Sequence, residues 1–377
     1  MFKAEELFQN VTDKNHPDET VLTIIQGKGT LPREQAGRNI HYDDASLSNY
    51  KKVEQGDFII HLRSFEGGLE MANEAGIVSP AYTILRCKRP HSSLFYDAYF
   101  HTDEFINHNL SKSVEGIRDG RQISYEAFKW LGIPYCEPTE QEKISNLFAA
   151  LNERIAKQRD LVESLKKYKR GLSKAVFSTN SELFPKSTVA SLGELFPFIR
   201  NGFVGTVTPF FTSQENGVRY LQGTNIHDGK ISDETAFYVT QAFNQKHSKN
   251  ILKSNDILVV QSGHVGECAV VGDNYAGSNC HALIIMSNGG ECASDYICQY
   301  INSDDGKKKI AAITTGNTIK HILATSIANI EVPLPSKKDQ QRIAELLNSW
   351  DNRIEQEIRN LCKLVRIKEG LLQQLFI

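Results

Sequence analysis

The sequence predicts an α+β protein in which one unit, a mixed globular region followed by a long helix, occurs twice. Residues 140–177 and 339–376 align without a gap at an offset of about 199 residues, and about ten of some 38 positions are identical. The globular regions before these two segments also share an outline. The chain is therefore predicted to contain an internal pseudo-twofold repeat.

Each repeated segment is predicted to be a long helix. Its apolar residues recur at alternating steps of three and four, and prolines stop the preceding chain at Pro134, Pro138, Pro333 and Pro335. A helix of this length spans about 57 Å. It has about three times as many residues as the average helix of a globular protein. Because such a helix cannot bury its apolar stripe alone, we predict an antiparallel two-helix coiled coil. Two ordinary core helices are the alternative that periodicity leaves open.

The first globular region shows short strand patterns separated by turn residues. We predict strands at Val21–Gln26, Asp57–Arg63 and Ala81–Leu85, with a Gly-rich turn at Ser64–Gly68. Such a turn lets the backbone approach a large ligand closely. A hairpin turn without function is the alternative, and sequence alone favours it.

The second globular region repeats these features. A strand at Asp256–Gln261 is followed by a turn at Ser262–Gly266. Arg121–Ile123 in the first half corresponds to Lys320–Ile322 in the second, because each comes shortly after a glycine and shortly before a proline stop. Residues 177–187 are rich in Ser, Thr, Asn and Pro, which predicts a linker.

Composition indicates a protein with no extreme bias. The 377 residues carry 43 Lys and Arg against 45 Asp and Glu, a formal net charge of −2. The seven cysteines form no C-x-x-C pair, so reduced thiols are expected rather than a disulfide framework or a zinc ribbon. No signal peptide or membrane-spanning stretch is evident, and we expect a soluble cytoplasmic protein.

Positive charge is concentrated in the second half of the first long helix. The basic residues there are Lys166, Lys167, Lys169, Arg170 and Lys174. They suit the negative end of a helix dipole, and a solvated helix face is the simplest interpretation. A local positive face also permits binding to nucleic acid or to a partner protein.

Patterns typical of catalysis are missing from the sequence. There is no phosphate-binding G-x-x-x-x-G-K-[ST] loop, no H-E-x-x-H helix, and neither Asn-Pro-Pro-Tyr nor Asp-Pro-Pro-Tyr. Pro17-Asp18-Glu19 is not followed by the E-x-K strand that a nuclease core needs. We therefore predict no catalytic residues and no metal site, and a binding or adaptor role.

A combination of motifs resembles the specificity subunits of type I restriction-modification systems. In the first half the motifs are Tyr50–Val53, Gly56–Ile60, Arg63–Gly68, Gly76–Tyr82 and Gly116–Arg121; in the second they are Tyr220–Ile226, Asn255–Leu258 and Ser262–Gly266. The Ile-Pro or Val-Pro stops before Glu140-Gln141 and Asp339-Gln340 complete the resemblance, which covers nearly the whole chain. The first helix start departs from the family pattern at Cys136–Gln141.

The resemblance implies a domain plan and a function. Residues 1–125 and 181–325 would be target recognition domains, and residues 126–180 and 326–377 would hold the conserved spacer helices. Each domain would read one half of a bipartite double-stranded DNA target in host defence, with the coiled coil setting the unread spacer between the halves. A 57 Å rod spans about seventeen base pairs at 3.4 Å each.

The resemblance also implies the partners. The chain would be non-catalytic and would carry no cofactor. It would recruit two modification subunits that bind S-adenosylmethionine and methylate adenine N6, and restriction subunits that use ATP and Mg²⁺. No membrane partner is expected.

Residues at the two turns and in the paired segments are the predicted DNA contacts, because polar side chains there would read base edges and phosphates; turn geometry is the alternative role for the glycines. In the first domain the candidates are Arg63, Ser64, Phe65, Gly67, Gly68, Arg118 and Arg121. In the second they are Gln222, Asn225, Gln261, Ser262, Gly263, His264, Lys320 and His321. Phosphate contacts or plain surface are predicted for Lys51, Lys52, Arg86, Lys88 and Arg89.

Two other classes of function stay open at this point. An unrecognised nuclease or methyltransferase would reveal itself by metal-dependent cleavage or cofactor binding by the purified chain. A protein-only coiled-coil adaptor would fail to bind DNA even with modification subunits present.

Overall fold

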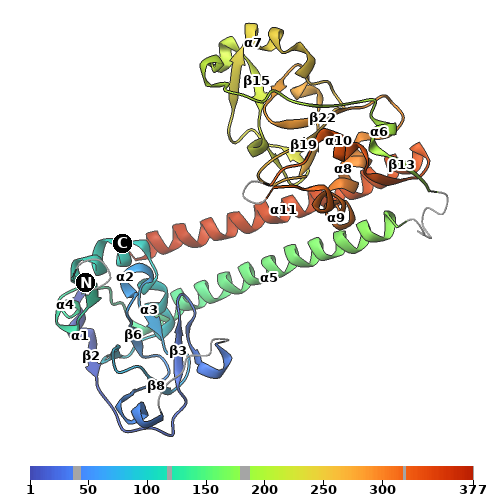
Figure 1. Ribbon diagram of the computed structural model, residues 1–377. Coiled ribbons are helices and arrows are strands. Elements are labelled where there is room, and N and C mark those ends of the chain that lie inside the picture. The colour runs from blue at the N-terminus through green and yellow to red at the C-terminus, as the bar shows by residue number, and fades with distance from the viewer. Residues whose placement is uncertain (37–43, 117–120, 179–186, 317–319, 377) are drawn as a thin grey trace. The chain divides into compact units, whose positions relative to one another are not determined.

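The computed structural model describes residues 1–36, 44–116, 121–178, 187–316 and 320–376 (Figure 1). The chain forms two compact units. Unit 1 comprises Met1–Arg159 and Arg359–Ile377, and unit 2 comprises Asp160–Ile358. The division falls within the two long helices, so each helix contributes to both units. The domain boundaries expected from the sequence, at residues 125, 180 and 325, stay predictions.

Unit 1 is built on a four-stranded antiparallel sheet. The strand order is β2 (Phe8–Val11), β9 (Thr83–Cys87), β6 (Phe58–Ile60), β7 (Glu70–Met71). Helix α3 (Ser93–Phe100) packs its aromatic residues on this sheet. The rings of Phe58 and Phe100 meet edge to face, with their centroids 4.9 Å apart. Buried aromatic area of this kind contributes strongly to the stability of a core.

Short elements complete unit 1. Helix α1 (Ala4–Leu7) leads into β2, and α2 (Ser64–Gly67) joins β6 to β7. The remaining strands pair as β1 (Phe2–Lys3) with β12 (Gly132–Ile133), β3 (Leu22–Ile25) with β4 (Gly29–Pro32), β5 (Lys51–Val53) with β8 (Gly76–Val78), and β10 (Val114–Glu115) with β11 (Gln122–Ile123). Helix α4 (Tyr125–Phe128) precedes β12.

Unit 2 repeats the same sheet. Its order is β14 (Phe198–Asn201), β22 (Leu283–Ser287), β19 (Ile257–Val260), β20 (Cys268–Val270). The strand pair β13 (Thr188–Ser191) and β23 (Glu331–Leu334) corresponds to β1 and β12, and α6 (Leu192–Leu195) corresponds to α1. The predicted duplication of the globular part is therefore present in the fold.

Further elements complete unit 2. A three-stranded sheet runs in the order β18 (Phe237–Thr240), β15 (Gly217–Leu221), β21 (Asn279–Cys280), and β16 (Ile226–His227) pairs with β17 (Lys230–Ile231). The helices are α7 (Gln241–Lys246), α8 (Ser294–Asn302), α9 (Asp304–Ile313) and α10 (Ala324–Ala328). Helix α8 packs in the main core, where Tyr296 and Ile297 are fully buried.

The two long helices are α5 (Pro138–Val176) and α11 (Lys337–Leu375), each of 39 residues. They pack in opposite directions within each unit, as predicted. In unit 1 the ring of Phe376 stacks on Phe148, with ring centroids 6.2 Å apart. In unit 2 Tyr168 stacks on Trp350 at 5.1 Å. The C-terminal part of each helix thus meets the N-terminal part of the other.

Three sequence-based boundaries need correction. The central strand β6 ends at Ile60 rather than Arg63, because the His61 amide donates to Ser64 Oγ and a helical turn begins there. The strand predicted at Ala81–Leu85 is β9, Thr83–Cys87. The predicted linker starts too early, because Phe177 is buried against Tyr296 in unit 2. Residues 179–186 of that linker lie outside the described residues.

Candidate DNA interface

The turn that follows the central strand of unit 1 is a single helical turn held by its own polar groups. Ser64 is fully buried, its Oγ accepts a hydrogen bond from the His61 amide at 2.8 Å, and its carbonyl accepts one from the Gly68 amide at 2.8 Å. Gly68 has φ +90°, and a Cβ there would lie 2.0 Å from the carbonyl oxygen of Phe100. Ser64 and Gly68 therefore build the turn, and Arg63 is exposed on it.

Arg121, in the segment that precedes the long helix, lies beside this turn. Its guanidinium carbon sits 4.3 Å from the ring centroid of Phe65. A guanidinium over an aromatic face is favourable and fixes the direction of the side chain. Arg63, Phe65 and Arg121 thus come together on one surface of unit 1. Arg118 lies outside the described residues.

The tip of the β3–β4 hairpin also belongs to this surface, and sequence reasoning missed it. Glu70 is fully buried, and its two carboxylate oxygens accept hydrogen bonds from the amides of Gly27 at 2.6 Å and Gly29 at 2.8 Å. Gly67 faces the side chain of Gln26, whose amide nitrogen would lie 1.9 Å from a Cβ at Gly67. Lys28 is therefore held exposed at a fixed tip next to the turn. The available signal was the Gly27-Lys28-Gly29 run, in which both glycines have positive φ.

The buried Glu70 also pairs with the half-buried His101. Burial opposes the ionisation of Glu70, but the hydrogen bonds from His101 and from the Gly27 and Gly29 amides outweigh it and lower the pKa of Glu70. Burial likewise disfavours a charged His101, but Glu70 and Asp97 outweigh it and raise the pKa of His101. The pair therefore favours its charged form.

The corresponding turn of unit 2 joins β19 to β20. The Gly266 amide donates to the Val260 carbonyl at 2.9 Å; Gly266 has φ +91°, and a Cβ there would lie 2.3 Å from Ile310. Gly263 also has positive φ but faces open space. Ser262 and Gly263 are exposed at the tip, and Gln261 is half-buried.

The segment before the second long helix again lies beside the turn. His321 forms an antiparallel bridge with Ser262, and the Ile322 amide donates to the Gln261 carbonyl at 3.1 Å. Thr315 and His321 exchange two backbone hydrogen bonds of 2.9 Å. The structure thus brings Gln261, Ser262 and His321 together, with Lys320 exposed next to them.

Asn225 and His264, two predicted residues of unit 2, form hydrogen bonds to the backbone of their own unit. Asn225 is fully buried; its Oδ1 accepts from the Gln222 amide at 2.9 Å, and its Nδ2 donates to the carbonyls of Ser232 and Thr235. This geometry favours a loop-holding role for Asn225, and Gln222 lies half-buried at the start of the same loop. His264 turns back toward hairpin β16–β17, where its Nε2 lies 3.1 Å from the Ile226 carbonyl.

The basic residues considered for phosphate contact in unit 1 are engaged by their own chain. Arg86 binds Asp57 through two hydrogen bonds of 2.9 and 2.7 Å, and Lys52 pairs with Glu19 at 2.7 Å. Lys51 and Lys88 donate to backbone carbonyls, and Arg89 lies over the rings of Phe2 and Tyr135. These contacts give all five residues a structural role.

The basic run of α5 is partly neutralised. Lys169 pairs with Asp351 of α11 at 2.5 Å, and Lys166 pairs with Glu163 at 3.1 Å. Lys167 and Arg170 are exposed on the same helix. Both lie in the part of α5 that belongs to unit 2.

The second half of the chain matches a known protein family. Residues 181–363 match the model described as the type I restriction modification DNA specificity domain. Residues 181–363 therefore belong to the family of type I restriction-modification DNA specificity domains. All eight candidate residues of unit 2 lie within the match, so they belong to a DNA specificity domain.

Comparison with known specificity subunits extends the likeness to the whole chain. The type I restriction enzyme MjaVIII specificity subunit of Methanocaldococcus jannaschii is 22% identical over 337 residues, which cover 86% of this chain and 79% of the relative. The crystal structure of the S subunit from M. genitalium is 14% identical and covers 100% of this chain and 95% of its own, with a TM-score of 0.59. A chain from a structural study of type I R-M assembly and conformational transition is 15% identical, covers 99% of this chain and 96% of its own, and has a TM-score of 0.57.

These likenesses establish the fold of a specificity subunit over both halves of the chain. The protein is the DNA-recognition subunit of a type I restriction-modification system, and the nuclease, methyltransferase and protein-only adaptor alternatives are not favoured. None of the described helices is both long and apolar enough to cross a membrane.

Proposed function

We propose that this specificity subunit reads a bipartite double-stranded DNA target, one half with each unit. Unit 1 reads through the turn at Arg63–Gly68 together with Arg121 and the hairpin tip at Lys28. Unit 2 reads through Gln261–Gly263 together with Lys320 and His321. Exposed arginine, lysine and glutamine side chains on such surfaces can contact phosphates and base edges.

One observation carries this proposal: the same juxtaposition occurs in both units. In each, the turn after the central strand touches the segment that precedes a long helix, through Arg121 on Phe65 in unit 1 and through His321 beside Ser262 in unit 2. The two contacts differ in chemistry although the surrounding folds correspond. Two domains that share a fold but differ in their surface side chains can read different half-sites.

The partners follow from the same proposal. The chain is non-catalytic, carries no catalytic cofactor and acts in the cytoplasm. It recruits two modification subunits, which bind S-adenosylmethionine and methylate adenine N6. Restriction subunits that use ATP and Mg²⁺ complete the assembly.

A methylation map of a host genome tests the assignment of half-sites. The chain is expressed with its modification subunits, and methylated motifs are read by single-molecule sequencing. We expect Arg63→Ala with Arg121→Ala to relax or abolish only one half of a split motif, and Gln261→Ala with Ser262→Ala to affect only the other. Arg89→Ala is the control. It removes a guanidinium that lies over the rings of Phe2 and Tyr135, and it should leave the motif unchanged. Identical effects of both pairs on the same half would contradict the assignment.

A further inference from the structure

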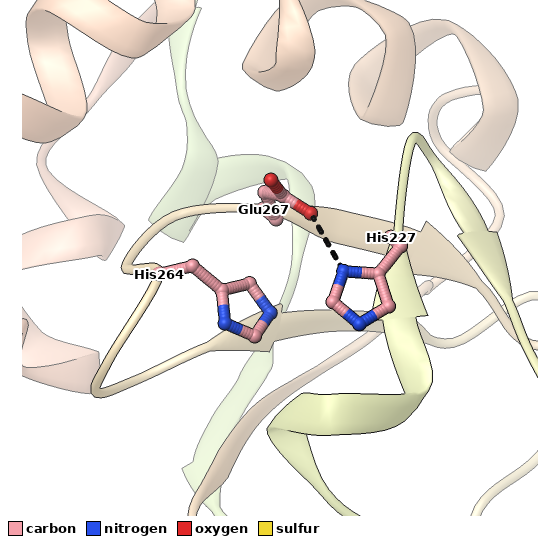
Figure 2. Close-up of side chains that lie close together, drawn as sticks. All are labelled: His227, His264 and Glu267. Carbon is pink, nitrogen blue, oxygen red and sulfur yellow. Dashed lines mark ion pairs between the residues drawn. The ribbon is translucent and has the colours of Figure 1, made fainter. Parts of the chain in front are cut away.

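Two histidines and a glutamate converge in unit 2, beside the turn that is proposed to read DNA. His227 ends strand β16, and His264 and Glu267 flank the glycine of the turn between β19 and β20 (Figure 2). One potential ligand atom from each side chain lies within 4.8 Å of the other two. Among the described residues, these three side chains form the group that is placed to hold a metal ion.

The contacts of His227 fix where its proton lies. Its Nε2 is 2.9 Å from the carbonyl oxygen of Thr224. A carbonyl oxygen only accepts hydrogen bonds, so Nε2 carries the hydrogen. In the neutral ring, Nδ1 then presents a lone pair, and this atom faces Glu267 Oε2 at 3.8 Å (Figure 2). A hydrogen bond from the second ring nitrogen to a carbonyl is the usual support of a metal-binding histidine.

Glu267 makes the arrangement electrostatically incomplete. Its Oε2 is inaccessible to solvent and has no hydrogen-bond partner within the described part of the chain. A carboxylate oxygen and an imidazole lone pair that face one another are both acceptors, so a proton or a metal cation between them is favourable. No group in the described part of the chain donates a hydrogen bond to Glu267 Oε2.

The ring of His264 provides a third ligand atom, its second nitrogen, at the same place. It stacks on His227 with ring centroids 4.9 Å apart and an interplanar angle of 20°. Figure 2 shows one of its nitrogens turned toward His227. Two imidazoles and one carboxylate are a ligand set that zinc and similar divalent transition metals prefer.

We propose that His227, His264 and Glu267 bind a divalent transition-metal ion such as Zn²⁺. Tetrahedral bonds of about 2.0 to 2.2 Å place ligand atoms about 3.3 Å apart, so the side chains must close by about 1.5 Å or less. Exposure of His227 allows this movement. A cleft of about 690 Å³ lined by His227 and Glu267 gives the ion a path from solvent. When His264 binds through Nε2, this nitrogen gives up its hydrogen bond to the Ile226 carbonyl, and the ring proton transfers through solvent to Nδ1.

The metal would join the recognition turn to hairpin β16–β17. Unit 1 makes a comparable connection without a metal, because Glu70 binds two backbone amides at the tip of hairpin β3–β4. In unit 2 the groups that meet at this hairpin are two histidine side chains and a glutamate. The scattered histidines gave no sequence signal for this site, since His227 and Glu267 are brought together only by the fold.

Titration of the full-length chain with ZnCl₂ by calorimetry tests the proposal, which does not depend on DNA reading. Cys362 is an exposed free thiol, so the measurements use a Cys362→Ser background. We expect one saturable site per chain, with affinity at least tenfold weaker in Glu267→Gln and lost in His227→Ala with His264→Ala. His108→Ala changes an exposed histidine of unit 1 and is the matched control, which should bind as the parent does.

Cobalt substitution supplies a second measurement. Co²⁺ in a site with nitrogen and oxygen ligands of low coordination number gives visible absorption bands, which should appear in the parent and not in the double histidine variant. Circular dichroism of each variant confirms that it is folded. If the folded parent chain shows no saturable Zn²⁺ binding, or if the double variant binds equally well, the proposal is wrong.

Discussion

The side-chain amides of Gln141 and Gln340 make the same hydrogen bond at the same place in their respective units. Gln141 Oε1 accepts from the Ser92 amide at 3.0 Å, and Gln340 Oε1 accepts from the Ala293 amide at 2.9 Å. Both glutamines are buried. Each bond joins the first turn of a long helix to the start of a helix that packs on the sheet, so the helix and the globular part of each unit are fixed together.

Replacing Gln340 by leucine should destabilise unit 2. Gln340 Nε2 also donates to the Pro335 carbonyl at 2.9 Å, so the substitution leaves a buried donor and a buried acceptor without partners. Each such group costs roughly 1 to 3 kcal/mol, and we expect a loss of about 3 kcal/mol in the free energy of unfolding. Urea denaturation measures it. Gln341→Leu changes an exposed neighbour and is the control; equal stability of the two variants would show that the buried bonds contribute nothing.

Stability of unit 1 should depend on pH through His101. The pKa of His101 in the folded chain is raised above its ordinary value of 6.5, because Glu70 and Asp97 outweigh the effect of burial. Its contribution is therefore complete below pH 6.5 and is lost as the pH rises through the folded-state pKa. The lowered pKa of Glu70 keeps its carboxylate charged in this range.

Urea denaturation at pH 6 and pH 8 measures this dependence. We expect the stability advantage of the parent chain over His101→Gln to be larger at pH 6 than at pH 8. His108→Gln, at an exposed position in the same unit, should show no such difference. An advantage that is equal at both pH values, or larger at pH 8, would rule out the charged pair.

Removing exposed charge from α5 should separate two roles for its basic run. If Lys167 and Arg170 contact DNA phosphates, replacing both by alanine should make the slope of log K against log salt shallower by about 1.8. Lys169→Ala is the comparison, because its pairing with Asp351 predicts lower stability with little change in slope. DNA binding by the assembled complex, measured over a range of salt concentrations, gives both slopes. An unchanged slope in the double variant would rule out contact between this exposed pair and DNA phosphates.

The repeat and the two long helices could be predicted from the sequence because both signals are local or periodic. Identities such as Gln141 with Gln340 recur at one offset, and the apolar period specifies the helical faces. The antiparallel direction also followed, and it appears in the contact of Tyr168 with Trp350. Helix ends were correct to within two residues, since prolines mark the starts.

The composition of the candidate surfaces could be predicted only in part. Arg121 on Phe65 and His321 beside Ser262 fulfil the expected pairing of turn and segment. Lys28 was missed because its position depends on Glu70, which is more than forty residues away in sequence. Asn225 was chosen for its amide, but that amide is used inside its own loop. Polar residue type does not reveal whether a side chain faces solvent or satisfies the backbone.

Lengthening both long helices by the same amount should lengthen the unread spacer of the DNA target. Seven residues inserted after Arg159 in α5 and seven after Ile358 in α11 fall where the chain divides into its two units. The insertion adds two helical turns, about 10.5 Å, and rotates the helix by only about 20° from its original register. The apolar faces therefore still meet, and both units keep their internal contacts.

At 3.4 Å per base pair, an added length of about 10.5 Å corresponds to about three base pairs. The methylated motif, read by single-molecule sequencing, should keep both half-sites and gain about three unread positions between them. Insertion of the same seven residues in α5 alone is the control, because it leaves the two helices unequal and should abolish methylation of any split motif. The doubly extended chain leaves the parts that read the half-sites untouched. If its motif keeps the original spacing, the helices do not set the distance between the half-sites.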